Sequence, residues 1–106
     1  MGPSYTYAAT CTRVIDGDSY RLEADCGFDI VARVNVRLHG YSCPELGTPE
    51  GQHALDVARE ILKPDVALVV RTYKTRTFAR WLGVITLPSG SLLGDVLVEA
   101  GVAVAA

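Results

Sequence analysis

The chain lacks any apolar run that approaches the ~20 residues of a membrane-spanning helix, and it has no repeat, linker or low-complexity segment. It also lacks an excess of basic charge, since ten Lys and Arg residues meet twelve Asp and Glu residues for a net charge of −2. Proteins that coat nucleic acid nonspecifically are usually basic, so any such contact must occur at a local basic patch. With 106 residues, we expect one domain over residues 1–106.

Cysteine is scarce, and its spacing matches no metal site. Cys11, Cys26 and Cys43 are odd in number, so at least one thiol is free or pairs with another chain. If a hairpin turns at Asp16-Gly17, Cys11 lies opposite about residue 22, too far from Cys26 for the roughly 7 Å that a disulfide allows. We therefore expect three reduced thiols, which suit an intracellular protein. The first residues show no basic head before an apolar stretch, so we expect no signal peptide and a cytoplasmic location.

The pattern of apolar residues predicts five short strands, because period-two alternation is typical of half-buried strands. Asp16-Gly17 is a strong signal for a two-residue hairpin between the first two of them. The segment Lys74 to Ala79 is polar and partly basic, and predicts a loop. Val102 to Ala106 is short and apolar, and predicts a last edge strand. The five main strands are expected over residues 5–15, 19–25, 28–38, 66–73 and 80–87.

Two helices are also predicted. Thr48 can cap the first, with Pro49 at its first position, and Pro64 stops it. Ser91 can cap the second, which Gly101 ends. Five short strands with a helix after the third predict a mainly β chain of the α+β class with two or three helices, folded as a five-stranded Greek-key barrel of the OB type. Such barrels often bind oligonucleotides, but the fold alone proves no function.

Five charged residues, in the order Asp16, Asp18, Arg37, Glu45 and Arg80, are the candidate catalytic and metal-binding residues. Asp16 and Asp18 can share a cation if their side chains point to one side, although Asp16-Gly17 is also an ordinary turn pair. Arg37 can be a solvated strand residue, Glu45 can favour a helix N-terminus, and Arg80 can pair with a carboxylate or lie over a ring. Together, the carboxylates can hold a cation and prepare a water, while the guanidinium groups take charge from a phosphate. The combination predicts metal-assisted phosphodiester cleavage.

Four strings hold these residues in order: Val14-Ile15-Asp16-Gly17-Asp18-Ser19, Val36-Arg37-Leu38, Cys43-Pro44-Glu45 and Phe78-Ala79-Arg80. Together they resemble the staphylococcal nuclease (thermonuclease) family, and the likeness extends from about Tyr7 to Ala106. The turn around residues 25–28 is similar to that of short phage-encoded members, which implies a phage or prophage origin. The resemblance implies an OB barrel that hydrolyses DNA and RNA phosphodiester bonds with calcium, by in-line attack of water, and leaves 3′-phosphates.

The resemblance also implies a role for each matching residue. Asp18 would bind calcium directly, and Asp16 would act close by or through water. Glu45 would orient or deprotonate the attacking water. Arg37 and Arg80 would hold the phosphate, because the planar guanidinium fork gives two hydrogen bonds to phosphate oxygens.

The metal site departs from the family at one position. Cys43 matches a position whose backbone carbonyl binds the ion, but Ser42 stands where the family usually has a second ligating aspartate. The cation therefore loses one unit of negative charge. Calcium takes about six to eight oxygens and its affinity follows ligand charge, so we expect weak binding unless substrate phosphate completes the shell. The loss could also shift selectivity towards Mg²⁺ or Mn²⁺.

The substrate contacts depart as well. The loop before the second arginine commonly reads Asp-Lys-Tyr-Gly-Arg in the family, and here Phe78 lacks the hydroxyl that would meet a terminal phosphate. Tyr41 can stack on a base or have a structural role. We also expect a homodimer that covers the apolar segment 102–106. The expected substrate-binding residues are Lys74, Arg76, Phe78 and Tyr41.

Two interpretations of function follow. The first is an active calcium-dependent endonuclease, weaker than the family type. The second is a catalytically silent OB module that binds nucleic acid or a protein partner. Retention of the two arginines, Asp18 and Glu45 favours the first. Ser42 and the altered segment 76–79 favour the second.

Overall fold

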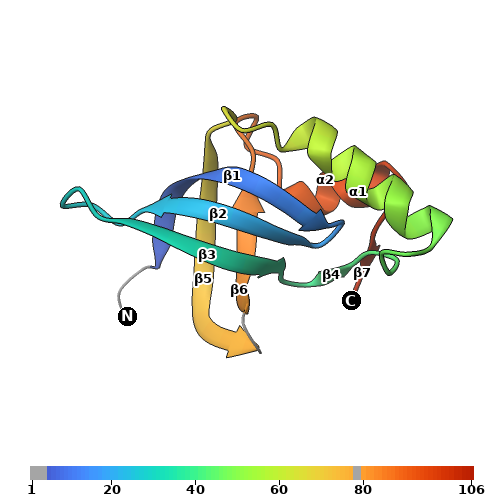
Figure 1. The fold of residues 1–106 in the computed structure, drawn as a ribbon, viewed down its shortest axis with the longest axis horizontal. Coiled ribbons are helices and arrows are strands. Elements are labelled where there is room, and N and C mark those ends of the chain that lie inside the picture. Colours follow the sequence, from blue (N-terminus) through green and yellow to red (C-terminus); the bar gives the residue numbers. More distant parts are fainter. Residues whose placement is uncertain (1–4, 78–79) are drawn as a thin grey trace.

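The computed structural model describes the backbone of residues 5–77 and 80–106, and the side chains of residues 5–73 and 80–106. Within these residues the chain is mainly β, with a closed five-stranded barrel and two helices (Figure 1). The neighbouring strands around the barrel are β1-β2-β3-β6-β5. This confirms the predicted OB-like architecture of the α+β class. The barrel strands are β1 (Thr6–Asp16), β2 (Ser19–Asp25), β3 (Val31–Leu38), β5 (Leu68–Thr77) and β6 (Arg80–Thr86).

The hairpin between β1 and β2 turns one residue later than predicted. Asp16 pairs with Ser19, so Gly17-Asp18 forms the two-residue loop. Cys11 lies opposite Leu22, and all three cysteines are free thiols, as expected. The inward alternation of β2 is confirmed, since its even-numbered side chains are buried. This turn places two aspartates at one end of the barrel.

The β2–β3 hairpin projects beyond the barrel (Figure 1), and β3 begins at Val31 rather than at the predicted Phe28. Gly27, Phe28 and Asp29 all have positive φ values. Residues in the left-handed conformation cannot continue an extended strand. Residues 28–30, which the alternation had assigned to this strand, therefore belong to the turn. At its other end, β3 pairs in parallel with β6, with Val36 opposite Trp81.

The segment predicted as a loop from Lys74 is a strand as far as Thr77, because β5 continues to that residue. Thr77 pairs with Arg80, and the register shifts between Thr72 and Arg76. Pairing with β6 satisfies the backbone of these polar residues, so the tertiary context overrides their composition. The remainder of the predicted loop, Phe78 and Ala79, lies outside the described residues.

Helix α1 (Pro49–Ile61) begins as predicted, with the Thr48 side chain accepting a hydrogen bond from the Gly51 N–H. Helix α2 (Leu93–Glu99) begins after Leu92, and its N-terminus has no side-chain cap. The prediction of Ser91 as the cap is wrong, because the Ser91 carbonyl closes the preceding turn by accepting from the Leu87 N–H. Gly101 ends α2 with a φ of 77°, as predicted.

A second, two-stranded sheet joins β4 (Tyr41–Ser42) to β7 (Val104–Ala105). The predicted last strand therefore forms, but its partner β4 was not predicted. Val102 and Ala103 are buried against the core of the same chain, whereas Val104 is 65% exposed. Residues 102 and 103 of the segment that motivated the expected homodimer are thus covered within one chain, whereas residues 104–106 are exposed, and the homodimer stays a prediction.

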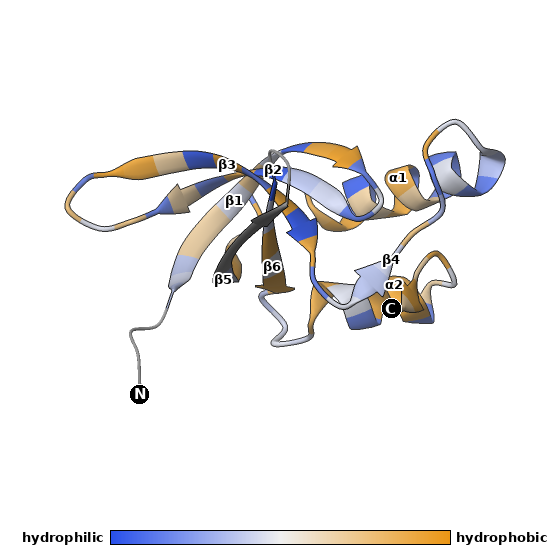
Figure 2. Cartoon of the chain, turned by 90° about the horizontal axis from the view of Figure 1, so that it is seen from below, coloured by the Kyte–Doolittle hydropathy of each residue, from blue (hydrophilic) through white to orange (hydrophobic). Residues whose placement is uncertain are grey.

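Both helices pack on the same end of the barrel, beside the β1–β2 turn (Figures 1 and 2). Ala54 and Ala58 of α1 and Leu93 and Leu97 of α2 are fully buried in the same core as the inward residues of the strands. In the described part of the chain, no helix is long and apolar enough to cross a membrane. The packing of α1 fixes the turn that carries the candidate site.

Candidate functional site

The Gly17-Asp18 turn is held between α1 and the loop after β4. A Cβ atom at Gly17 would lie 2.8 Å from Cβ of Ala54 and 2.9 Å from Cβ of Cys43. Both distances are shorter than real Cβ contacts, so only glycine fits this close approach. Tyr20, fully buried beneath the turn, donates its hydroxyl hydrogen to the Gly17 carbonyl. The position of the neighbouring carboxylates is thus set by packing rather than by the turn alone.

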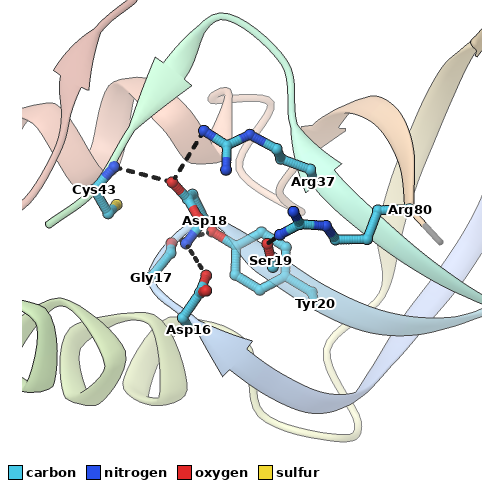
Figure 3. A network of polar contacts seen from close by, with 8 residues as sticks. All are labelled: Asp16, Gly17, Asp18, Ser19, Tyr20, Arg37, Cys43 and Arg80. Atoms are coloured by element: carbon cyan, nitrogen blue, oxygen red, sulfur yellow. Dashed lines mark hydrogen bonds and ion pairs between the residues drawn. The ribbon is translucent and has the colours of Figure 1, made fainter. Parts of the chain in front are cut away.

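Asp18 is the centre of the polar network in Figure 3. Asp18 is only 6% exposed, and one of its carboxylate oxygens, Oδ2, accepts a hydrogen bond of 3.1 Å from the Cys43 N–H. The same oxygen lies 3.6 Å from Nη2 of Arg37. The Asp18 carbonyl also accepts from the Leu38 N–H at 2.8 Å. These bonds tie the turn to the end of β3 and to the loop after β4.

Arg37 and Arg80 both reach this turn, although they lie far apart in the sequence. The parallel pairing of β3 and β6 brings Val36 opposite Trp81, which places the two arginines on neighbouring strands. Nη1 of Arg80 donates a hydrogen bond of 3.0 Å to the buried Ser19 hydroxyl. Figure 3 shows both guanidinium groups directed towards the turn. One positive charge thus lies beside the buried Asp18 carboxylate, and a second lies on the neighbouring Ser19.

Asp16 lies on the other side of the turn, and its Oδ1 accepts a hydrogen bond of 3.1 Å from the Asp18 N–H. Burial raises the pKa of Asp16, and the neighbouring Asp18 carboxylate raises that pKa further. Two carboxylates that repel each other in this way form a site that favours a cation.

The donors around this turn fit a weakly held calcium ion. Asp16 and Asp18 supply carboxylate oxygens, and the Cys43 carbonyl and Ser42 are the other predicted donors. Calcium takes about six to eight oxygens, so water and substrate phosphate must supply the rest. No cluster of three or more His, Cys, Asp or Glu side chains suited to a metal occurs among the residues that the structure describes. Calcium binding at this turn, and its expected weakness, stay predictions.

Cys43 contacts the Asp18 carboxylate through its backbone and not through its thiol. Its N–H binds Asp18, and burial, followed by the charges of Asp18 and Asp16, raises the pKa of its thiol to about 11. The thiol is therefore protonated near neutral pH and is a poor metal ligand. A role through the backbone carbonyl, as the sequence resemblance implies, needs no thiolate.

Glu45 is exposed, in the loop that enters α1. Its carbonyl accepts a 2.7 Å hydrogen bond from the Thr48 hydroxyl, and a Cβ atom at Gly51 would lie 1.8 Å from the Glu45 carbonyl oxygen. The first turn of α1 therefore fixes the backbone of Glu45. In the described part of the chain, no side chain forms a hydrogen bond or ion pair with its carboxylate, so Glu45 stands apart from the network around Asp18.

Tyr41 lies against α2. Its hydroxyl donates a short hydrogen bond to Oδ1 of Asp95, which raises the pKa of the tyrosine. A Cβ atom at Gly94 would lie 2.2 Å from the Tyr41 ring. These contacts support the structural alternative for Tyr41 and leave its stacking role a prediction.

The remaining predicted substrate contacts cannot be placed. Phe78 lies outside the described residues, and Lys74 and Arg76 have a described backbone in β5 but no described side chain. The sequence did not indicate that Tyr20 and Ser19 belong to this network. The alternation of β2 indicated that Tyr20 is buried, but no pattern indicated its hydrogen bond to Gly17 or the hydrogen bond from Arg80 to Ser19.

Comparison of the sequence with models of known protein families and with curated proteins finds no match. The assignment of function therefore depends on the residues that meet at the β1–β2 turn.

Proposed function

We propose that this chain is a calcium-dependent nuclease that hydrolyses phosphodiester bonds of DNA and RNA by in-line attack of water and leaves 3′-phosphates. One observation carries the proposal. Arg37 of β3 and Arg80 of β6 meet at the turn that carries Asp18, with the Cys43 N–H completing the group (Figure 3). A barrel does not need an arginine at a buried carboxylate and a second arginine on the neighbouring serine in order to fold, since buried ion pairs contribute little net stability.

The two arginines would bind the phosphate. Arg37 keeps 36% of its side chain exposed, and Arg80 uses one of its nitrogens on Ser19. A guanidinium has five N–H donors, so each retains donors for phosphate oxygens. Their charge would stabilise the extra negative charge that develops on the phosphate as the water oxygen approaches.

The carboxylates of Asp16 and Asp18 would hold the cation, together with the Cys43 carbonyl. When bound, calcium supplies a Lewis acid that polarises the phosphate. Asp18 and Arg37 now form an ion pair with each other. With both ligands bound, Asp18 would pair with the cation and Arg37 with the phosphate.

Glu45 would take the proton from the attacking water. The water oxygen forms the new bond to phosphorus, the bond from phosphorus to the 5′-oxygen breaks, and that oxygen leaves with a proton from solvent. The exposed position of Glu45 at the entry to α1 leaves its carboxylate open to water, as a general base requires.

A second function is favoured by a specific observation. Ser42 places a neutral hydroxyl one residue before Cys43, where a third carboxylate would complete a strong calcium site. The alternative is therefore an OB module that binds nucleic acid or a protein partner without cleaving. The predicted substrate contacts, Lys74, Arg76, Phe78 and Tyr41, would serve either function.

Cleavage of single-stranded DNA tests the proposal. Cutting should require millimolar Ca²⁺, stop with EDTA, and be lost in Arg80→Ala but retained in Arg59→Ala, which removes an exposed arginine of α1. Glu45→Gln should lose cleavage with little loss of binding. Absence of cutting in Ca²⁺, Mg²⁺ and Mn²⁺ would reject the nuclease, and cutting that survives Arg80→Ala would point to a contaminant.

A further inference from the structure

The tip of the β2–β3 hairpin presents an aromatic side chain to solvent. Phe28 is 97% exposed, and Ile30 beside it is 56% exposed. Phe28 and Asp29 have φ values of 53° and 59°, a left-handed conformation that costs a bulky residue roughly 1 kcal/mol or more. An exposed aromatic residue held in a strained backbone is a candidate for a binding role.

The tip is fixed by hydrogen bonds. The Cys26 N–H donates to the Ile30 carbonyl and the Ile30 N–H donates to the Gly27 carbonyl, both at 2.9 Å. Oδ1 of Asp25 accepts from the Gly27 N–H at 2.9 Å. Because the backbone is bonded in this way, Phe28 is presented in a defined direction, and little entropy is lost when it binds a partner.

An apolar pocket of about 240 Å³ opens at the base of the same hairpin. Apolar cavities of about 150 Å³ can hold a benzene molecule, so this pocket has room for a phenyl ring. Phe28 of the same chain does not fill it, since that side chain is almost fully exposed. The lining includes Tyr7, Ala24, Cys26, Ala32, Val34 and Trp81.

We propose that two copies of this chain form a dimer in which the Phe28 ring of each copy enters the apolar pocket of the other. The knob and the pocket lie on one hairpin, with Cys26 at the pocket only two residues before Phe28. Two hairpins that run antiparallel across a two-fold axis would place each tip at the base of the other. One contact then implies the second, as in an isologous interface.

Charge at the tip argues against other occupants. Asp25 and Asp29 flank Phe28, and no basic residue lies between residues 22 and 32. Two carboxylates beside the ring would repel both a nucleic acid and an anionic lipid surface. A second copy of the chain offers an apolar pocket for the ring, and because it carries the same two carboxylates, the dimer should strengthen as salt screens their repulsion.

The pocket reaches towards the candidate nuclease site. Asp18 and Arg37 lie where β2 begins and β3 ends, and Phe28 lies at the other end of the hairpin, but the pocket lining extends as far as Val36 and Trp81, which adjoin Arg37 and Arg80 in the sequence. A phenylalanine buries roughly 150–250 Å², so two rings and their surroundings give a small interface. Interfaces below about 1,200 Å² are usually weak, and we expect a reversible dimer that forms at high micromolar concentration.

Sedimentation equilibrium between 10 µM and 1 mM tests the proposal. The wild type should show a monomer–dimer equilibrium, and Phe28→Ser should raise the dissociation constant at least about tenfold, as loss of a central aromatic contact does. Val104→Ser is the matched control, because Val104 is an exposed apolar residue on β7, away from the hairpin. It should leave the equilibrium unchanged. A monomer at 1 mM, or a dimer that Val104→Ser abolishes and Phe28→Ser does not, would overturn the proposal.

A disulfide trap tests the geometry. In Phe28→Cys, the new thiol should reach the partner's Cys26 in the pocket and form a covalent dimer on mild oxidation. The same change in a Cys26→Ser background should give covalent dimers much more slowly, because Cys11 is 2% exposed, Cys43 lies by the β1–β2 turn, and the two thiols introduced at position 28 would meet only by collision. Covalent dimers that form as fast without Cys26 as with it would overturn the proposed packing. So would binding of the monomer to anionic vesicles through Phe28.

Discussion

The Asp18 carboxylate lies 3.6 Å from the Arg37 guanidinium, with the acid buried and the arginine partly exposed. The two groups that the proposed chemistry needs for a cation and for a phosphate thus neutralise each other. A cation bound at Asp18 would take over the negative charge that Arg37 now neutralises, which frees Arg37 to bind a phosphate. A phosphate bound at Arg37 would likewise free Asp18 for the cation. We therefore expect metal and substrate each to strengthen binding of the other, and linkage makes the two effects equal in size.

Replacement of Arg37 tests this pair. Arg37→Ala leaves Asp18 with the Cys43 N–H as its remaining described partner, so we expect a loss of roughly 1–3 kcal/mol in the free energy of unfolding, measured by urea titration. Cleavage should fall by about 10²-fold or more, as loss of one phosphate-stabilising donor does. Arg33→Ala is the control, because the exposed Arg33–Glu23 pair should be worth no more than about 1 kcal/mol. Equal effects of the two changes would argue against a special role for Arg37.

Addition of a carboxylate at position 42 tests the metal site. Ser42→Asp restores one negative charge beside Cys43, and calcium affinity follows ligand charge. We expect the dissociation constant for Ca²⁺, measured by calorimetry, to fall at least about tenfold, which corresponds to about 1.4 kcal/mol. Ser42→Asn changes the shape without the charge and should have little effect. If both variants bind Ca²⁺ as the wild type does, position 42 does not face the cation.

A methyl group on Gly17 tests how packing positions the site. The added Cβ would meet Ala54 and Cys43 at distances below 3.0 Å, so the turn must shift away from α1. We expect Gly17→Ala to cost about 1–3 kcal/mol of stability, as overpacking does, and to weaken Ca²⁺ binding by displacing Asp16 and Asp18. Thermal unfolding and calorimetry measure the two effects.

The partner variant Gly17→Ala/Ala54→Gly removes one of the two clashes and should recover part of the stability. Wild-type stability and metal affinity in Gly17→Ala alone would show that the turn is not held by this contact.

The sequence predicted the barrel because alternation and turn residues are local signals. It failed where the outcome depended on pairing between distant segments. The polar residues from Lys74 to Thr77 form a strand because β6 lies beside them, and β4 exists because β7 returns to it. The order of Asp18, Arg37 and Arg80 indicated a common site, but their meeting depends on the parallel register of β3 and β6. No local pattern could indicate that Glu45 would lie apart from this network.

Tyr20 predicts how stability changes in alkali. Its hydroxyl is buried and bonded to the Gly17 carbonyl, and burial, with smaller effects from nearby acidic groups, raises its pKa far above the ordinary value of 10.0. The raised pKa means that the folded chain holds the phenol proton after the unfolded chain has lost it. This contribution is complete below pH 10 and is lost as the pH rises above 10, by about 1.4 kcal/mol per pH unit.

Tyr20→Phe should therefore have two opposite effects. At pH 7 it leaves the Gly17 carbonyl without its donor, so we expect a loss of roughly 1–3 kcal/mol. Between pH 10 and pH 12 its stability should fall less steeply than that of the wild type, and the two curves should converge. Urea titrations across this range measure both slopes. Tyr73→Phe, at a tyrosine that is 44% exposed, is the control and should leave the alkaline slope close to that of the wild type. Parallel curves for the wild type and Tyr20→Phe would mean that the Tyr20 hydroxyl ionises as readily in the folded chain as in the unfolded one.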